Sequence, residues 1–447
     1  MKREISLLQA TSINMIDMVG IGPFVMMSIV IQLVGSNLFI WAWVFGAVTA
    51  LIDGMIWSEL GAAYPLAGGS YNFLKEAYGK KGGPLMSFLF VWQTCLMSSL
   101  VVASGAIGFS QYFGYLVPLS FWEEKLVSGA LVIAITALLY RNIRTIGKIS
   151  VFLWAGVIIT ILWIIISGLT HRQVAYSPLP DAHQTMFSKA FMVLIGHASV
   201  KTIYSYLGYY NVCHLGGEIR NPGRNIPRSI FISIIAIAIF YLAMNISIVG
   251  VIPWKQAMDS KFVISLFMEK IYGGRMARVA TLLVLWIAFA SLFAVVLGYS
   301  RVPYAAAADG NFFPVFARLH PKKDFPYISL LFVSGLGFCF CMVLRLADAI
   351  NAILAMRILV QFVAQAVGVV LLRRRKGTKD LPFRMWLYPI PVILSVVIWL
   401  FVWYLTGLAA LVGLFLVACG IVVFYVARDD WNRQKAVVDL DLNGGAK

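Results

Sequence analysis

The chain has 447 residues, of which 61% are hydrophobic and only 12% are charged, and its formal net charge is +17. Soluble domains usually carry about 45–50% apolar and about 25% charged residues, so this composition excludes an ordinary soluble protein and indicates an integral membrane protein. The positive charge does not require nucleic acid as a partner, since loops that face anionic lipid on the cytoplasmic side are basic.

Twelve apolar runs are candidate membrane spans, because a helix needs roughly 20 apolar residues to cross about 30 Å of hydrocarbon. In chain order they lie near residues 9–34, 38–62, 85–117, 126–141, 149–169, 187–214, 229–252, 277–303, 327–345, 347–372, 386–405 and 407–427. With the N-terminus inside, most of the lysines and arginines fall on the cytoplasmic side. This distribution predicts a multi-pass protein of the plasma or inner membrane with both termini in the cytoplasm. The basic outer segment 253–278 is expected to contain an amphipathic surface helix.

The first run contains the stretch "MVGIGPFVMM", in which Gly20, Gly22 and Pro23 interrupt an otherwise apolar helix. Glycine costs about 1 kcal/mol and proline about 3 kcal/mol in a helix interior, and a freed backbone group in lipid costs several more. We therefore predict a helix that ends near Val19, an unwound segment, and a second half-helix that begins at Pro23. The amides at such a start attract an anion, for example a carboxylate. The alternative is a kink that serves packing alone.

The sixth run has a second interruption, with Gly208 among aromatic residues in the middle of the run and Gly216 and Gly217 at its end. Interrupted spans one and six are corresponding members of two halves of five spans. That pairing indicates a transporter built from inverted repeats, with its binding site near the bilayer midplane between the two breaks.

Four segments carry a family resemblance in the same order along the chain. They are "VGIGPF" (19–24), "SELGAAYPLAGGSYNFLKEAYG" (58–79), "YSYLGYYNVCHLGGEIRNPGRNIPRSI" (204–230) and "SRVPYAAAADGNFFPVFARLHP" (300–321). The chain resembles the amino acid, polyamine and organocation (APC) superfamily of transporters, in its amino acid permease branch. Four ordered matches of this length are far more specific than a lone G-x-G.

The resemblance implies an all-α LeuT-like fold of 12 transmembrane helices with discontinuous helices one and six. The implied units are a first five-helix repeat over 9–169, an inverted second repeat over 187–372, two peripheral helices over 386–427 and a cytoplasmic tail over 428–447. It also implies that an amino acid binds between the unwound segments. The substrate-binding residues carried over by position are Gly20, Ile21, Gly22, Phe24, Tyr204, Ser205, Tyr206, Leu207, Gly208 and Tyr209.

In this assignment the substrate carboxylate meets the amides of Ile21, Gly22 and Phe24, and the ammonium meets carbonyls near 17–20 and 204–207. Tyr206 and Tyr209 are expected to border the pocket for the substrate side chain. The chain departs from the family pattern at Ile21, Pro23 and Leu207, which replace polar or hydrogen-bonding groups. The departures favour neutral, apolar amino acids as substrates.

Ionisable residues inside spans are functional candidates, because a buried charge in the membrane is costly. Asp17, Asp53, Lys201 and Arg357 are such residues. One interpretation is that they form buried ion pairs that fix helix packing. The other is that a carboxylate or Lys201 titrates during transport, which predicts proton coupling. Glu59 and Glu218 lie near cytoplasmic span ends and are expected to form gate or scaffold pairs with basic residues.

Sodium coupling remains an alternative, because Ser291 offers a hydroxyl to a sodium ion, although Val157 stands where some relatives place a lysine. Exchange without net ion coupling is a further alternative. The leading prediction is a secondary active amino acid transporter that works by alternating access. A transporter-like sensor that binds an amino acid without moving it is the competing class. The sequence contains no catalytic grouping, metal-ligand spacing or cofactor motif that predicts an enzyme.

Overall fold

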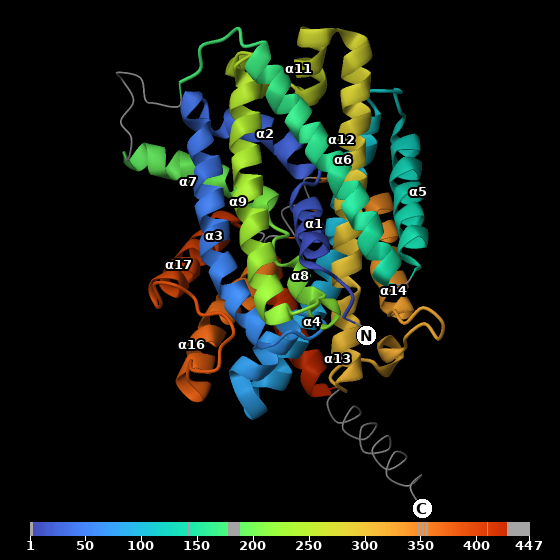
Figure 1. The fold of residues 1–447 in the computed structure, drawn as a ribbon, viewed down its shortest axis with the longest axis vertical. Helices are drawn as coiled ribbons and strands as arrows, with labels where there is room; N and C mark the ends of the chain where they lie inside the picture. The colour runs from blue at the N-terminus through green and yellow to red at the C-terminus, as the bar shows by residue number, and fades with distance from the viewer. Residues whose placement is uncertain are drawn as a thin grey trace, which may run out of the picture.

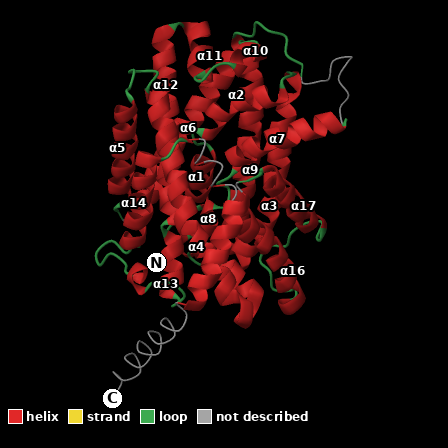
Figure 2. Ribbon diagram, turned by 180° about the vertical axis from the view of Figure 1, so that it is seen from behind, coloured by secondary structure: helices red, strands yellow, loops and turns green. Residues whose placement is uncertain are grey.

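The computed structural model describes residues 3–141, 143–177, 188–346, 349, 353, 356–408 and 410–426. These ranges form helices and no β-strand, apart from two isolated bridges. Figure 1 shows that most helices run along the long axis of the molecule. The short segments α1 (Leu7–Met18) and α8 (Asn211–His214) lie near its middle, and the view from behind in Figure 2 places them there as well.

The remaining helices are listed here in chain order. They are α2 (Gly22–Val34), α3 (Ile40–Ala63), α4 (Ser70–Phe113), α5 (Phe121–Leu139), α6 (Ile143–Thr170), α7 (Lys189–Tyr206), α9 (Pro222–Val249), α10 (Trp254–Met258), α11 (Val263–Tyr272), α12 (Gly274–Tyr299), α13 (Arg301–Ala308), α14 (Tyr327–Val343), α16 (Ala364–Lys376) and α17 (Ile390–Leu405). Short 3₁₀ segments are η1 (Asn37–Phe39), η2 (Gly216–Glu218) and η3 (Pro314–Ala317), and η4 (Ile358–Val363) is π-helical. A further helix covers Ala410–Val426.

Five described stretches are long and apolar enough to cross a membrane, by length and composition: Asn37–Ala63, Ser70–Phe113, Ile143–Thr170, Pro222–Val249 and Gly274–Ala308. Two bent pairs also qualify when each is taken together: α1 with α2 at 42°, and α17 with the helix over Ala410–Val426 at 110°. These helices support a multi-pass membrane protein. The predicted total of twelve spans stays a prediction, and the tail over 428–447 lies outside the described residues.

The predicted break in the first span is confirmed. A capping box at Ser6 starts α1, which ends at Met18, and α2 begins at Gly22 with Pro23 in its first turn. Proline suits this position, because the first amides of a helix have no partner inside the helix. The two half-helices are therefore separated by only three residues, which leaves both of their ends at the same depth of the molecule.

The break after α7 is also confirmed, and Gly208 explains it. Its φ of 122° is a conformation that L-residues rarely adopt. A Cβ atom at this position would lie 2.8 Å from the amide nitrogen of Met18 and 2.9 Å from the carbonyl carbon of Asp17. Glycine is thus required twice, for the backbone turn and for the close approach of α1.

Glycines bring α3 close to its neighbours α7 and α9. A Cβ on Gly46 would lie 2.8 Å from the Thr202 hydroxyl, and one on Gly54 would lie 2.6 Å from Ile234. Small residues at helix contacts are typical of membrane proteins, where close van der Waals packing takes the place of a hydrophobic driving force between helices. The packing of α3 against α9, and of α9 against α1, positions the two breaks.

The basic segment 253–278 contains the amphipathic helix predicted for it. In α11 the side chains of Val263, Phe267 and Met268 are buried, whereas Glu269 and Lys270 are exposed. This helix packs on α12 and on α2. It therefore covers the end of the second half-helix of the first span.

Candidate functional site

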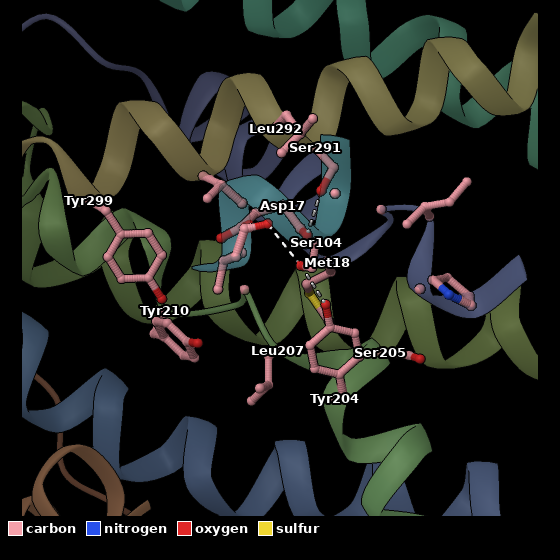
Figure 3. A pocket seen from close by; sticks show the side chains of 18 of the residues that line it. Asp17, Met18, Ser104, Tyr204, Ser205, Leu207, Tyr210, Ser291, Leu292 and Tyr299 are labelled. Atoms are coloured by element: carbon pink, nitrogen blue, oxygen red, sulfur yellow. Dashed lines mark hydrogen bonds between the residues drawn. The ribbon is translucent and has the colours of Figure 1, made fainter. Parts of the chain in front are cut away.

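A cavity of about 70 Å³ lies between the two breaks (Figure 3). One water needs roughly 10–15 Å³ of such space, so the cavity holds more than a single water. Its wall comes from the α1–α2 break, from α4, from the α7–α8 break, from α12 and from Arg357. The lining residues are Asp17, Met18, Gly20, Ile21, Gly22, Pro23, Val101, Ser104, Gly105, Tyr204, Ser205, Leu207, Gly208, Tyr210, Ser291, Leu292, Val295, Tyr299 and Arg357.

The start of α2 presents unpaired amides at this wall. Ile21 is its N-cap residue and makes no side-chain cap, in contrast to Ser6 at the start of α1. The first amides of a helix lack intrahelical partners and carry the positive end of the helix dipole. Pro23 has no amide hydrogen, so the donors at this start are fewer than in an ordinary helix. The geometry suits a single small anion such as a carboxylate.

Tyr241 of α9 joins the ends of the two broken spans. Its hydroxyl lies 2.8 Å from the Met18 carbonyl oxygen and 3.1 Å from the Ser205 carbonyl oxygen. A second link runs from the Val212 amide to the side-chain oxygen of Asn14, at 2.9 Å. The two breaks are therefore held together directly, and one hydroxyl is shared by a carbonyl from each.

Two serine hydroxyls approach the breaks from outside them. Ser104 of α4 lies 3.4 Å from the Tyr204 hydroxyl, and Ser291 of α12 donates to the Asp17 carbonyl oxygen at 3.3 Å (Figure 3). A Cβ atom on Gly20 would lie 2.7 Å from the Ser291 oxygen. Helices α4 and α12 thus complete the polar part of the wall.

Arg357 is a cation buried in the wall, with 2% of its surface exposed. It donates to the Tyr299 hydroxyl and lies 5.6 Å from the centre of the Tyr210 ring and 5.8 Å from that of Phe362. Its Nε has no hydrogen-bond partner among the described residues. The π-helical segment η4 begins directly after it, and such segments are frequent at functional sites.

Most of the predicted site residues line the cavity, but five do not. Phe24, Tyr206, Tyr209, Asp53 and Lys201 lie outside its wall. Tyr206 packs edge-on against Trp43 and lies 5.1 Å from Tyr241, between ring centres. The expectation that Tyr206 and Tyr209 border the pocket therefore does not match their placement. The Tyr206 ring lies against side chains of α3 and α9, and the Tyr209 hydroxyl donates to Asp53 of α3.

Asp53 accepts hydrogen bonds from neutral groups. They are the Tyr209 hydroxyl at 2.6 Å, the Trp57 indole at 2.8 Å, and the Ser395 hydroxyl and Trp399 indole at 3.2 Å each. The four ion pairs of the described residues do not include Asp53, so the buried ion pair considered for it is not formed there. The carboxyl instead connects α3, the second break and α17.

Sequence reasoning missed several wall residues. They are Val101, Ser104 and Gly105 of α4, Tyr210 of the second break, and Leu292, Val295 and Tyr299 of α12. A signal for α4 was present, because its span contains an unusual density of serine, glycine and alanine between Ser98 and Gly108. Small residues mark helix faces that allow close approach.

Glu59 and Glu218 each pair with a basic residue, as predicted. Glu59 accepts two bonds from Arg373 and one from the Met385 amide, and Glu218 pairs with Arg301 at 3.3 Å. Asp309 pairs with Lys75, and its carboxyl also accepts from Tyr71 at 2.5 Å. The Gly68 amide donates to the His214 carbonyl oxygen at 2.9 Å. Three of the four matched segments thus meet in one layer beside the cavity.

Residues 5–433 match the family model described as "Amino acid permease". The branched-chain amino acid permease BcaP of Bacillus subtilis is 24% identical, over 93% of this chain and 88% of that protein, and the serine/threonine exchanger SteT of the same organism is 26% identical, over 95% and 97%. The large neutral amino acids transporter small subunit 2 of Mus musculus is 26% identical, over 74% and 63%. With a match over nearly its whole length, the chain belongs to the amino acid permease family of membrane proteins.

Proposed function

We propose that this protein is a secondary active transporter that moves amino acids across the cell membrane by alternating access. One observation carries the proposal: the amides at the start of α2 and the carbonyl ends of α1 and α7 face one small cavity. An amino acid has an anionic and a cationic end, so a site that offers opposite main-chain poles at short range is suited to it. The relatives carry names of amino acid permeases and transporters rather than of enzymes.

In the proposed binding mode the carboxylate meets the amides around Ile21 and Gly22, and the ammonium meets carbonyls at the ends of α1 and α7. Tyr241 already occupies the Met18 and Ser205 carbonyls, so the carbonyls that remain for the ammonium are those of the neighbouring residues. The side chain of the substrate faces an apolar part of the wall, formed by Val101, Leu292 and Val295. The small volume and this apolar lining favour small, neutral amino acids.

Alternating access assigns the layer of ion pairs to the closed side of the cavity. Lys75–Asp309 joins the first half of the chain to the second, and Glu218–Arg301 joins two segments of the second half. In the proposed LeuT-like arrangement, residues 9–169 and 187–372 are the two inverted repeats and 386–427 are peripheral. Both termini lie in the cytoplasm, as the distribution of basic residues favours. The layer then forms a cytoplasmic seal that opens when the substrate is released inside.

Proton coupling is part of the proposal. Asp17 and Arg357 both belong to the cavity wall, and Asp53 binds the Tyr209 hydroxyl next to the second break. A carboxyl at either place is able to change protonation in step with the opening of the cavity, because water access changes the cost of its charge. Sodium coupling and exchange are the alternatives that the experiment below separates.

The test is uptake into liposomes that contain the purified full-length protein. Radiolabelled amino acids are offered with and without sodium and with an imposed pH gradient. We expect saturable uptake that requires no sodium and rises when the substrate side is more acidic. Uptake that depends on sodium would show that sodium, and not a proton, is the coupling ion. Uptake that occurs only when the liposomes already contain an amino acid would indicate exchange. Ligand-induced stabilisation without any flux identifies the protein as a sensor.

The site itself is tested by Gly22→Leu, whose side chain would enter the cavity. A Cβ at Gly22 already lies 3.5 Å from the Tyr204 ring and 3.6 Å from the Ser205 hydroxyl. Gly335→Leu is the matched control, because a Cβ on this glycine of α14 has no atom within 4 Å. We expect Gly22→Leu to weaken the affinity for the amino acid by about tenfold or more. Uptake and ligand-induced stabilisation, both measured at a fixed amino acid concentration, should fall accordingly. Normal uptake by Gly22→Leu would show that the cavity is not the substrate-binding site.

A further inference from the structure

A second depression, unrelated to the cavity between the breaks, lies on the side of the molecule. This groove has a volume of about 910 Å³ and is bounded by α3, by the first turns of α9 and by residues 382–386 before α17. It shares no lining residue with the cavity. The groove is therefore a separate feature that the transport proposal leaves unused.

The floor of the groove is apolar and aromatic. Phe231 of α9 stacks on Trp386 with ring centres 5.2 Å apart and ring planes at 23°, and the Phe383 ring centre lies 5.8 Å from that of Phe231. Trp386 is 57% exposed, and Ile232 of the same groove is 47% exposed. Ile232 lies on α9, a helix long and apolar enough to cross a membrane, where an exposed apolar side chain faces lipid chains. Exposed tryptophan is typical of the level where acyl chains meet headgroups.

The rim of the groove carries two cations. Arg224 and Arg228 lie four residues apart on α9, so their side chains share one face of the helix. Neither guanidinium forms a hydrogen bond or an ion pair within the described part of the chain. Glu59, the carboxylate beside this region, is already bonded to Arg373 and to the Met385 amide. The two like charges therefore stand together with no protein anion to offset them.

The two sides of the groove are held together by contacts within the protein. The Met385 amide donates to Glu59 at 2.7 Å, which holds residues 382–386 against the end of α3. A Cβ on Gly223 would lie 3.0 Å from the Cβ of Pro382, so the start of α9 packs closely on the same segment. A fixed groove binds an occupant with a smaller loss of conformational freedom than a mobile one.

We propose that this groove is a binding site for one anionic phospholipid of the leaflet on the Arg224 side. Its phosphate lies between Arg224 and Arg228, and an acyl chain lies along Phe231, Phe383 and Trp386. Guanidinium groups bind phosphate oxygens through charge-assisted hydrogen bonds, and basic pockets between membrane helices recognise anionic headgroups. The combination of an apolar floor and two unpaired cations at one end matches an anionic phospholipid, which has an acyl chain and a phosphate without a compensating cation. The bound lipid fastens residues 382–386 to α9.

The experiment uses the full-length protein in neutral detergent micelles. Phosphatidylglycerol and phosphatidylcholine with identical acyl chains are titrated, and bound lipid is counted by native mass spectrometry together with the melting temperature. We expect saturable binding of one phosphatidylglycerol, with a higher melting temperature, and much weaker binding of phosphatidylcholine. Inorganic phosphate tests whether the headgroup chemistry suffices without the chain, and we expect it not to raise the melting temperature.

The variant Arg224→Gln/Arg228→Gln removes both charges and is expected to weaken phosphatidylglycerol binding roughly thirtyfold. Arg224→Lys/Arg228→Lys keeps the charge and is expected to retain most of the binding, which shows that the variant fold tolerates change there. Arg275→Gln/Arg278→Gln, at exposed positions of α12, is the matched control and is expected to bind as the unchanged protein does. Equal binding of the two lipids, or full binding by the glutamine variant, would overturn the proposal. Stabilisation by phosphate alone would also overturn it, because the apolar floor would then have no role.

Discussion

The hydroxyl of Tyr241 lies 2.8 Å from the carbonyl oxygen of Met18, and this contact ties α9 to the end of the first half-helix. The same hydroxyl is 3.1 Å from the Ser205 carbonyl oxygen. Both carbonyls belong to helix ends that lack intrahelical partners, and in a membrane protein each such group needs a donor. One side chain of α9 therefore satisfies acceptors from both broken spans.

We predict that Tyr241→Phe lowers the free energy of unfolding by about 1–3 kcal/mol, since it leaves buried carbonyls without a donor. Uptake per folded molecule should fall as well, because the ends of α1 and α7 are no longer held together. Uptake kinetics and thermal unfolding of the purified protein measure the two effects. Tyr272→Phe is the control: its hydroxyl lies 3.1 Å from Ser167, on the side of α11, and its loss should leave uptake unchanged.

Gly208→Ala should be far more harmful than an alanine at another glycine with positive φ. At Gly208 the φ is 122°, and a Cβ would lie 2.8 Å from the Met18 amide nitrogen. At Gly35 the φ is 63°, and no atom lies within 4 Å of the added Cβ. Gly35→Ala is expected to cost only the left-handed strain of about 1–2 kcal/mol. If thermal unfolding shows equal losses for both variants, the close approach of α1 to the second break is not important for stability.

Asp53→Asn is expected to break the link between the second break and α17. An amide offers one acceptor oxygen, whereas the carboxylate uses both of its oxygens to accept from Tyr209, Trp57, Ser395 and Trp399. Donors left without an acceptor in a buried site cost about 1–3 kcal/mol. Ser395→Ala, which removes one donor and leaves the carboxylate, should cost less. Thermal unfolding ranks the two, and the reverse ranking would contradict this account of the network.

The proposed proton coupling predicts a specific loss in Asp17→Asn. The asparagine cannot bind and release a proton, so uptake should no longer rise when the substrate side is made more acidic. Exchange of labelled for unlabelled amino acid across the membrane should persist, since it needs no net proton movement. Lys201→Ala tests the lysine that the sequence offers as the alternative to a carboxylate. Loss of the pH response in Lys201→Ala, with the response intact in Asp17→Asn, would move the assignment from the cavity wall to α7.

We predict that Lys125 contributes to the thermal stability of the protein and has no part in transport. Its ammonium is buried and donates to the carbonyl oxygens of Cys341 at 2.8 Å and Leu344 at 2.7 Å, at the end of α14. A cation suits the negative end of a helix, and hydrogen bonds to charged groups contribute about 1.5–3 kcal/mol. Lys125→Met should therefore lower the melting temperature while uptake per folded molecule is retained. An unchanged melting temperature would show that water replaces the ammonium there.

The two breaks were predictable from the sequence because their causes are local. Gly20, Gly22 and Pro23 act on the backbone of their own helix, and Gly208 supplies a dihedral angle that its neighbours cannot adopt. The directions of the neighbouring side chains were not predictable in the same way. Tyr206 and Tyr209 lie outside the cavity wall, and their positions depend on contacts with side chains of α3 and α9.

The partners of Asp53 show the second limit of sequence reasoning. Ser395 and Trp399 lie 342 and 346 residues away along the chain, and no spacing rule connects them with α3. The pairing of Glu59 with Arg373 spans a similar distance, but there the excess of basic residues near span ends made a partner expected. Charge complementarity thus predicts that a residue is paired, and only the packed fold tells with which residue.

The hydrogen bonds of Asp53 also bear on how far this chain can be shortened. Two of its four donors come from α17, a helix that the proposed division places outside the ten core spans. A chain cut before residue 386 would leave this carboxyl in the membrane with only Tyr209 and Trp57 to solvate it. Helix α17 is therefore needed to solvate a buried carboxyl of α3, and a minimal version of this permease has to retain the indole and the hydroxyl that α17 contributes.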